Sequence, residues 1–488
     1  QLYLALNKTD KALNLFQKAK KQFPEDPRPL RAIAKVEYDQ GKLEKSQESL
    51  ELLFKKHEGD NYGRVLKARI LIKKRKFHQA KNLLQKVIKN NPNFANGHFY
   101  LALAHFGLGE NGMGKASLDR TLKINPEHIR ANLLQAETLL QEKEYTQALK
   151  LCNQVIKNKP SEVRAYLLNG RILLAQKKLS EAREVFEKLL KIAPDTPSAF
   201  LFLGRIDQAQ KKDEAALNNF KQALAKSPYS TQALSSIVQT QLMLKQPDKA
   251  LAFCKKQLDK FNDKPKLKAF IYNLQGTTLL TQKKTEQAIA SLQKAVQANP
   301  EWPAPYLKLA RIYSAQGNIE QVIKQYETIH SKNPQYLPAI MNLGMLYEKQ
   351  GELDKAIEYY KKCLKLNEEF PPAANNLAYL LIETGGNKDR ALDLARIAKR
   401  QRPNDPGIAD TLGWAFVQKN AFDSAIAQFR DALEKMPDNP SILYHLGVAY
   451  HKNDQNELAL GTLQKALQTE NDFPEKDKVT ELIDKIKR

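Results

Sequence analysis

Three cysteines are the only thiols in the sequence that could act as nucleophiles or metal ligands. Cys152, Cys254 and Cys363 lie about a hundred residues apart, so they form neither a CxxC metal knuckle nor a disulfide framework. None has a histidine near it in the sequence, and each stands where a helix would place an interior apolar side chain. Buried cysteine behaves as a small hydrophobe. We therefore expect the three thiols to lie in the core and to be unreactive.

The remaining residue types with catalytic potential follow no motif. The nearest histidine pairs, His98 with His105 and His445 with His451, lack the i, i+4 or HExxH spacing of zinc ligands. No GxxxxGK[ST] or GxSxG motif occurs, and the glycine-rich run 107–114 falls between two predicted helices rather than after a strand. The sequence therefore predicts no catalytic, cofactor-binding or metal-binding residue, and we do not expect an enzyme.

The charge of the chain is unevenly distributed. The 488 residues carry a net charge of +24, and residues 1–300 contain 53 Lys and Arg against 28 Asp and Glu. Residues 301–488 contain 25 basic and 26 acidic residues, so the excess lies in the N-terminal three-fifths. Such a field attracts anionic partners but does not determine a fold. No run of 18 apolar residues occurs, so no transmembrane helix is predicted.

An internal repeat in the sequence predicts the helices that carry these charged residues. Five prolines follow one another at intervals of 34 residues, namely Pro92, Pro126, Pro160, Pro194 and Pro228. The same interval separates Pro300 from Pro334 and Pro403 from Pro437. A proline cannot continue a helix, so each is expected to follow one. A fixed period of this length is typical of a solenoid of helical repeats.

Small and large apolar residues keep the same period. Ten residues after most of these prolines stands a small residue: Ala102, Ala136, Gly170, Gly204, Ala310, Gly344, Gly413 and Gly447. Eight residues before the prolines stands a large one, such as Leu84, Phe186, Phe220, Tyr326 or Phe429. Small residues let two helices approach closely while the large residue fills the adjoining groove. The pattern predicts two antiparallel helices per repeat, stacked into a continuous core.

This pattern resembles the tetratricopeptide repeat family in period, small-residue positions and proline. The resemblance covers essentially the whole chain and implies an all-α, right-handed superhelical solenoid. Thirteen full repeats are expected, starting near residues 27, 61, 95, 129, 163, 197, 231, 269, 303, 337, 371, 406 and 440. The predicted organisation is a partial repeat (1–26), a basic sub-array (27–262), an insertion and hinge (263–268), a second sub-array (269–473) and a capping helix (474–488).

The resemblance also implies which residues meet a partner, because the first helices of such repeats line a concave groove. Their ninth residues form a basic zone followed by an apolar and aromatic one. The candidate partner-binding residues are Arg31, Lys35, Arg69, Arg171, Arg205, Arg311, Met341, Met345, Tyr379, Trp414 and Tyr444. The alternatives are ordinary solvated helix surface for the basic zone and packing within a repeat for the aromatic zone. Arginine, however, suits bidentate contact with carboxylate or phosphate.

The leading functional hypothesis is a non-catalytic scaffold for other proteins or extended peptides, with an anionic polymer or acidic partner at the N-terminal groove. Segments 376–379, 410–414 and 444–447 resemble those of bacterial envelope lipoproteins that accompany exopolysaccharide export and exosortase protein sorting. That resemblance favours the periplasm, or a membrane anchor upstream of residue 1, over the cytoplasm. The alternatives are a helical-repeat protein that binds a polyanion or nucleic acid, and the regulatory part of a larger enzyme. Tight nucleic-acid binding is not expected, because stacking aromatics do not alternate with the basic residues.

Overall fold

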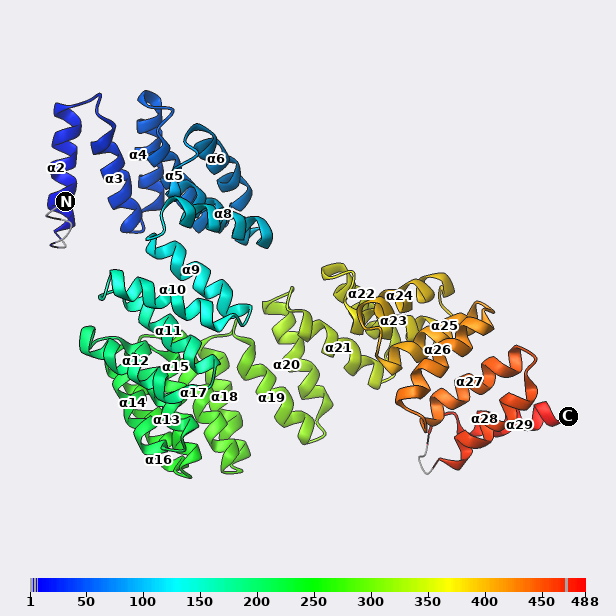
Figure 1. Ribbon diagram of the computed structural model, residues 1–488. Coiled ribbons are helices and arrows are strands. Elements are labelled where there is room, and N and C mark those ends of the chain that lie inside the picture. The colour runs from blue at the N-terminus through cyan, green and yellow to red at the C-terminus, as the bar shows by residue number, and fades with distance from the viewer. Residues whose placement is uncertain (1–2, 4–5, 7, 470–472) are drawn as a thin grey trace. The chain divides into compact units, whose positions relative to one another are not determined.

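Helices account for all the regular secondary structure that the computed structural model describes, namely in residues 3, 6, 8–469 and 473–488 (Figure 1). These residues form 28 helices and no strand, which confirms the predicted all-α repeat solenoid. The chain divides into two compact units, Gln1–Thr240 and Gln241–Arg488. The hinge predicted at 263–268 remains a prediction.

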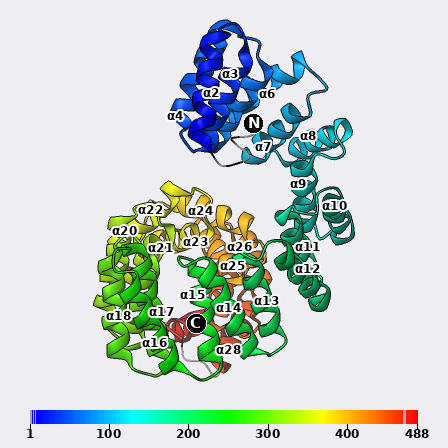
Figure 2. The same cartoon turned by 90° about the vertical axis from the view of Figure 1, so that its left-hand side faces the viewer.

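Unit 1 consists of helix pairs that follow one another along the chain. At its N-terminal end α2, α3 and α4 lie side by side (Figure 2). Its helices are α2 (Thr9–Gln22), α3 (Pro27–Asp39), α4 (Leu43–Lys56), α5 (Asn61–Lys73), α6 (Phe77–Asn90), α7 (Ala95–Gly107), α8 (Asn111–Ile124), α9 (Ile129–Gln141), α10 (Tyr145–Asn158), α11 (Val163–Ala175), α12 (Leu179–Ile192), α13 (Pro197–Ala209) and α14 (Asp213–Lys226); α15 (Thr231–Met243) contains the boundary.

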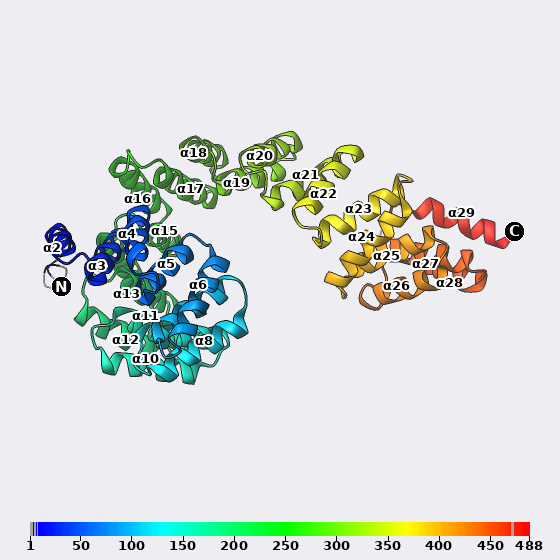
Figure 3. The ribbon, with the colours of Figure 1, turned by 90° about the horizontal axis from the view of Figure 1, so that it is seen from above.

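Unit 2 has the same construction, and in it α25 to α28 stack as successive pairs before α29 (Figure 3). Its helices are α16 (Pro247–Lys260), α17 (Pro265–Thr281), α18 (Thr285–Ala298), α19 (Pro303–Ala315), α20 (Ile319–Lys332), α21 (Leu337–Lys349), α22 (Leu353–Leu366), α23 (Pro371–Glu383), α24 (Lys388–Gln401), α25 (Pro406–Gln418), α26 (Phe422–Lys435), α27 (Pro440–Lys452), α28 (Asn456–Gln468) and α29 (Lys476–Lys487).

The repeat starts inferred from the sequence coincide with the first residues of the odd-numbered helices α3 to α27, with one difference at α17. That helix begins at Pro265 rather than near residue 269 and has 17 residues instead of the usual 13. The four additional residues extend the first helix of the repeat at its N-terminal end. Of the partial repeat predicted over 1–26, residues 1–2, 4–5 and 7 lie outside the described residues, and α2 is its second helix.

In several repeats a glycine of the first helix makes a close contact with an aromatic ring of the second. A Cβ placed on Gly204 of α13 would lie 2.5 Å from the Phe220 ring of α14, and one on Gly413 would lie 2.6 Å from the Phe429 ring. Both rings are fully buried. Glycine is therefore required at these two positions, because any side chain would occupy the space of the ring.

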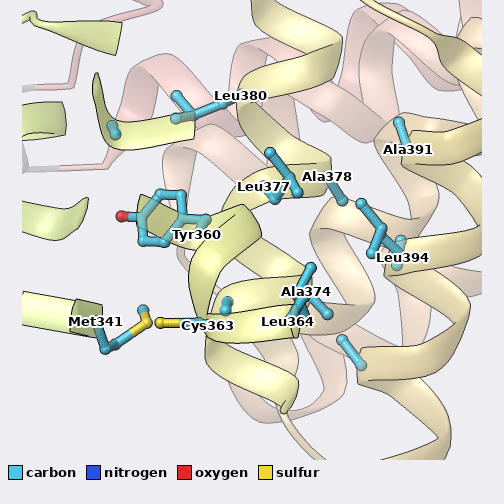
Figure 4. Packing of buried hydrophobic residues seen from close by; sticks show 14 of the residues in the cluster. Met341, Tyr360, Cys363, Leu364, Ala374, Leu377, Ala378, Leu380, Ala391 and Leu394 are labelled. Atoms are coloured by element: carbon cyan, nitrogen blue, oxygen red, sulfur yellow. The ribbon is translucent and has the colours of Figure 1, made fainter. Parts of the chain in front are cut away.

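The core continues from repeat to repeat within each unit. In unit 2 the cluster that contains Tyr360 extends from α20 through α25, and part of it is shown in Figure 4. Cys363 lies within this cluster, and Met341 points toward it from α21. Neighbouring pairs thus share one apolar interior, as stacked repeats require.

Among the residues that the structure describes, no helix has the length and apolar character to cross a membrane.

We expect Gly204→Ala to lower the free energy of unfolding by about 1–3 kcal/mol, because the new methyl group overlaps the Phe220 ring. Adding Phe220→Leu should recover part of that loss, since the smaller side chain makes room and the two effects are not additive. The measurement is urea unfolding followed by circular dichroism.

Gly112→Ala in α8 is the matched control, because a Cβ there meets no atom within 4 Å. It should leave stability unchanged or raise it by up to about 1 kcal/mol. Equal losses in Gly204→Ala with and without Phe220→Leu would contradict the steric explanation.

Candidate functional site

The first helices of the N-terminal repeats enclose a cavity of about 440 Å³ between α3, α5 and α7. We call it the arginine cavity. Three of the predicted partner-binding residues, Arg31, Lys35 and Arg69, line it together with Arg28. Its other lining residues are Ala32, Tyr62, Gly63, Val65, Leu66, Phe94, Asn96 and Tyr100. The structure thus brings side chains from three successive repeats into one basic and aromatic hollow.

Arg31 is fixed by the residue that begins the next repeat. Asp60 is the N-cap of α5 and accepts hydrogen bonds from the Gly63 backbone N–H (2.6 Å) and from Arg31 Nε (2.6 Å). The Asp60 side chain is 1% exposed, and Arg31 forms an ion pair with it while its guanidinium lies 5.1 Å from the centre of the Tyr62 ring. Removing Arg31 would leave a buried carboxylate without its cation, so this residue supports the fold as well as the cavity.

Arg69 is the most enclosed cation of the cavity, with a side chain that is 19% exposed. Its guanidinium lies 4.3 Å from the Tyr38 ring centre and 5.4 Å from that of Tyr100. Asp39 is 4.0 Å from Arg69 and 2.5 Å from Lys35, so one half-exposed carboxylate serves two cations. The buried Nε of Arg69 has no hydrogen-bond partner among the residues that the structure describes. Its hydrogen-bonding capacity is therefore incompletely used.

The arginine cavity has a small excess of positive charge, because its four cations pair with three carboxylates that lie just outside its wall, Asp26, Asp39 and Asp60. Four basic side chains line it, and no carboxylate does among the described residues that form its wall. Arg28 is mostly exposed and donates to Asp26, whose pKa is lowered chiefly by that side-chain hydrogen bond. Low-dielectric walls beside such cations strengthen their attraction for an anion. The cavity can accept a carboxylate or phosphate beside an apolar or aromatic group.

A second cavity, of about 330 Å³, lies between α7, α9 and α11. Its floor is formed by buried and half-buried leucines and its rim by exposed arginines. The lining residues are Phe99, Leu103, Arg130, Leu133, Leu134, Glu137, Arg164, Leu167, Leu168 and Arg171. Arg171 is half exposed and pairs with Glu137 of the preceding repeat at 3.2 Å. Arg130 Nη1 donates to Tyr100 Oη (2.6 Å), which joins this rim to the arginine cavity.

The other two predicted arginines lie outside both cavities. Arg205 on α13 and Arg311 on α19 are exposed, and no ion pair of either occurs within the described part of the chain. The guanidinium of Arg205 lies 5.7 Å from the Phe202 ring centre. Neither residue lines the arginine cavity or the second cavity.

The predicted aromatic zone is only partly an open surface. Met341 is 7% exposed and belongs to the core, which differs from the expected groove position because its side chain turns toward Cys363 (Figure 4). Met345, one turn later, is 50% exposed. Tyr379, Trp414 and Tyr444 are half-buried. They rest on the cores of their repeats while keeping one side in solvent.

Sequence reasoning missed the carboxylates that partner the predicted cations. Asp60, Asp39 and Glu137 hold Arg31, Lys35 and Arg171, respectively. Only Asp60 had a signal in the sequence, because an aspartate immediately before a predicted helix is an expected N-cap. The other two depend on how neighbouring turns and repeats are brought together.

The three thiols are buried, and burial raises the pKa of each to about 12. In the described residues no group of three or more His, Cys, Asp or Glu side chains converges in the manner of a metal site.

Models of the tetratricopeptide repeat match more than half of the sequence. The matched residues are 1–26, 65–112, 114–163, 139–206, 279–343, 338–370 and 413–454. The chain belongs to the tetratricopeptide repeat family. In general terms, a tetratricopeptide repeat solenoid of this kind is a protein-interaction scaffold, typically a non-catalytic one, and its partners are proteins or peptides.

Solved structures of similar build include the Cut9–Hcn1 hetero-tetramer of the APC/C, with 16% identity, a TM-score of 0.43 and coverage of 100% of this chain and 94% of that one. The human IFIT1 dimer with m7Gppp-AAAA has 18% identity, a TM-score of 0.42 and coverage of 75% and 88%. PilF of Pseudomonas aeruginosa has 18% identity, a TM-score of 0.36 and coverage of 41% and 92%. Likenesses of this degree say nothing about what the present repeats bind. No curated protein matches the sequence.

We expect the three cysteines of the native protein to resist iodoacetamide at pH 8. With a pKa of about 12, the thiolate fraction at that pH is about one in ten thousand, and only the thiolate attacks the reagent. The measurement is alkylation followed by mass spectrometry. In urea all three should be modified, and rapid modification of any of them in the native protein would contradict a purely structural role.

Proposed function

We propose that the chain is a non-catalytic scaffold whose first-helix face in unit 1 binds an extended, acidic segment of a partner protein. The arginine cavity carries the proposal, because it joins four basic side chains and three aromatic rings and no carboxylate lines it among the described residues. The second cavity also combines basic and apolar side chains, namely three arginines and five leucines, although Glu137 lines it as well. In a segment that alternates acidic and apolar residues, the acidic side chains would pair with the basic residues of the cavities and the apolar side chains would cover their apolar residues.

An acidic protein segment is favoured over a structureless polyanion by the apolar part of the cavities. Leu133, Leu134 and Leu168 offer surface that gains from covering by apolar side chains. A bare polyphosphate or acidic polysaccharide would use the arginines alone. Nucleic acid remains the alternative for the aromatic rings of the arginine cavity, where Tyr62 and Phe94 meet edge to face at 5.1 Å.

We further propose a place in the bacterial envelope, where the scaffold would help to organise secretion or exopolysaccharide machinery. This proposal is supported by the resemblance of the segments 376–379, 410–414 and 444–447 to those of envelope repeat lipoproteins. Its test is the location of the full-length protein in fractionated cells of the native host. Exclusive recovery in the cytosol would overturn it.

Arg28→Glu with Lys35→Glu should weaken binding of a fluorescein-labelled peptide of four Glu-Leu units by about tenfold, because both reversals place negative charge at the cavity mouth. Both side chains are largely exposed, so the fold should be retained. The measurement is fluorescence anisotropy, with a peptide of four Gln-Leu units as the neutral comparison.

The matched control is Lys45→Glu with Lys55→Glu on α4. These lysines are exposed, belong to the second helix of the same repeat and change the net charge equally. Affinity should then fall less than about twofold. Equal losses in the two double variants, or equal binding of the Glu-Leu and Gln-Leu peptides by the wild type, would show that the cavity is not the site.

Arg171→Glu with Arg205→Glu tests whether the binding face continues beyond the arginine cavity. A segment long enough to reach both cavities should lose affinity by about threefold or more, while helix content by circular dichroism stays intact. The measurement is anisotropy with Glu-Leu peptides of four and eight units. If the longer peptide binds this variant as well as it binds the wild type, the face ends at the first cavity.

A further inference from the structure

Near the end of unit 2, three consecutive first helices present an aromatic face. Tyr379 is on α23, Trp414 on α25 and Tyr444 on α27, and each of these helices contacts the next. The Trp414 ring stacks on His445 with 4.4 Å between centroids, and its centroid is 6.5 Å from that of Tyr444. We call Tyr379, Trp414 and Tyr444 the aromatic face. Its side chains are half-buried, so their positions are fixed by packing while part of each remains accessible.

Three carboxylates lie at or near these rings, and they were not predicted from the sequence. Glu383 accepts a hydrogen bond from Trp414 Nε1 (3.0 Å), and Asp410 is hydrogen-bonded to His445 Nδ1 (2.8 Å). Glu475 accepts from Ser441 Oγ (2.9 Å). Through residues 8–469 and 473–488, no Lys or Arg forms an ion pair with any of the three.

The two units differ in this respect. In unit 1 the predicted groove cations Arg31, Lys35 and Arg171 already have carboxylate partners from the chain itself. At the aromatic face Glu383 and Glu475 are hydrogen-bonded to Trp414 and Ser441, Asp410 is paired with His445, and no Lys or Arg of the described residues forms an ion pair with any of the three carboxylates. A group of carboxylates without a Lys or Arg partner is complementary to a positive ligand.

The pKa values of Tyr379 and Tyr444 are affected by these carboxylates. Burial is the main reason that the pKa of Tyr379 is raised to about 12, and the negative charges of Glu383, Glu475, Asp410 and Glu348 raise it further. The pKa of Tyr444 is raised by burial and then by Glu475, Glu383 and Glu481. Several carboxylates therefore act on the same small region.

We propose that the aromatic face binds an arginine side chain presented by a segment of a partner protein. A guanidinium stacks on Trp and Tyr rings and donates bidentate hydrogen bonds to a carboxylate such as Glu383. Arginine suits the site better than lysine, because the planar group uses a ring face and a carboxylate at once. This role is independent of the acidic segment proposed for unit 1 and gives the scaffold a second ligand of opposite charge.

The test uses the full chain immobilised on beads and two pools of labelled heptapeptides. One pool has arginine fixed at the centre and the other has citrulline, its neutral isostere; the other six positions are random uncharged residues. We expect the arginine pool to be retained at least about threefold more than the citrulline pool. Equal retention of the two pools would overturn the proposal.

The decisive variant is Glu383→Gln, which keeps an acceptor for Trp414 Nε1 and removes only the charge. Retention of the arginine pool should fall to that of the citrulline pool. Glu434→Gln on α26 is the matched control, since Glu434 is exposed on a second helix, and it should retain the peptides like the wild type. Unchanged retention by Glu383→Gln would overturn the proposal.

Two further outcomes separate this proposal from its competitors. Glu383→Gln should bind the Glu-Leu peptide as the wild type does, so failure at the aromatic face and failure at the arginine cavity are distinguishable. Sedimentation analysis of the wild type and of Glu383→Gln at several concentrations tests whether a second copy of this chain occupies the aromatic face. A dimer of the wild type that Glu383→Gln dissociates would assign the face to a second copy of this chain and overturn the proposal.

Discussion

The contact between a small residue on the first helix and a large one on the second, 16 residues later, is the constraint on which every repeat depends. Where the large residue is a fully buried aromatic ring, as in Phe186, Phe220, Tyr360 and Phe429, the partner is glycine, whereas the half-buried Tyr326 stands opposite Ala310. Where it is Leu118 or Cys152, the residue 16 positions earlier is alanine. A fully buried ring is thus combined with the smallest residue, because a close approach of the two helix axes leaves no room for both a ring and a Cβ. A site that uses three successive first helices inherits its geometry from this spacing.

Most of the fold follows from the sequence because the information is local and repeated. The prolines mark where helices end, and the small and large residues mark where they touch, so twelve of the thirteen repeat starts agree with the helix boundaries. The exception is α17, where an Asn-Asp-Lys-Pro segment resembles an inserted loop but its proline occupies the first turn of a longer helix. A proline at a helix N-terminus and a proline after a helix look alike without the residues that pack around them.

The site was less predictable, since its chemistry depends on side chains brought together from different repeats. Counting to the ninth residue of each repeat found Lys35 and Arg69, and Arg31 was taken from the first turns of the same helix as Lys35; the three do share one cavity. The same count could not show that Asp60 already neutralises Arg31, or that Glu383 stands beside Trp414. Met341 shows the limit of the periodic argument: one helical turn separates it from the exposed Met345, and that turn places it in the core.

The ion pair between Arg171 and Glu137 joins residues of consecutive repeats, and Asp60, the partner of Arg31, is the N-cap of the first helix of the next repeat. The charge that a partner meets is therefore a property of two adjoining units and not of either one alone. Repeat proteins change in length by gaining or losing whole units, and here the loss of a single unit would separate an arginine from its carboxylate on one side of the break. Such an event would alter the electrostatic pattern of the surface even if every remaining helix kept its sequence, so a lineage could acquire a new binding preference without any point substitution.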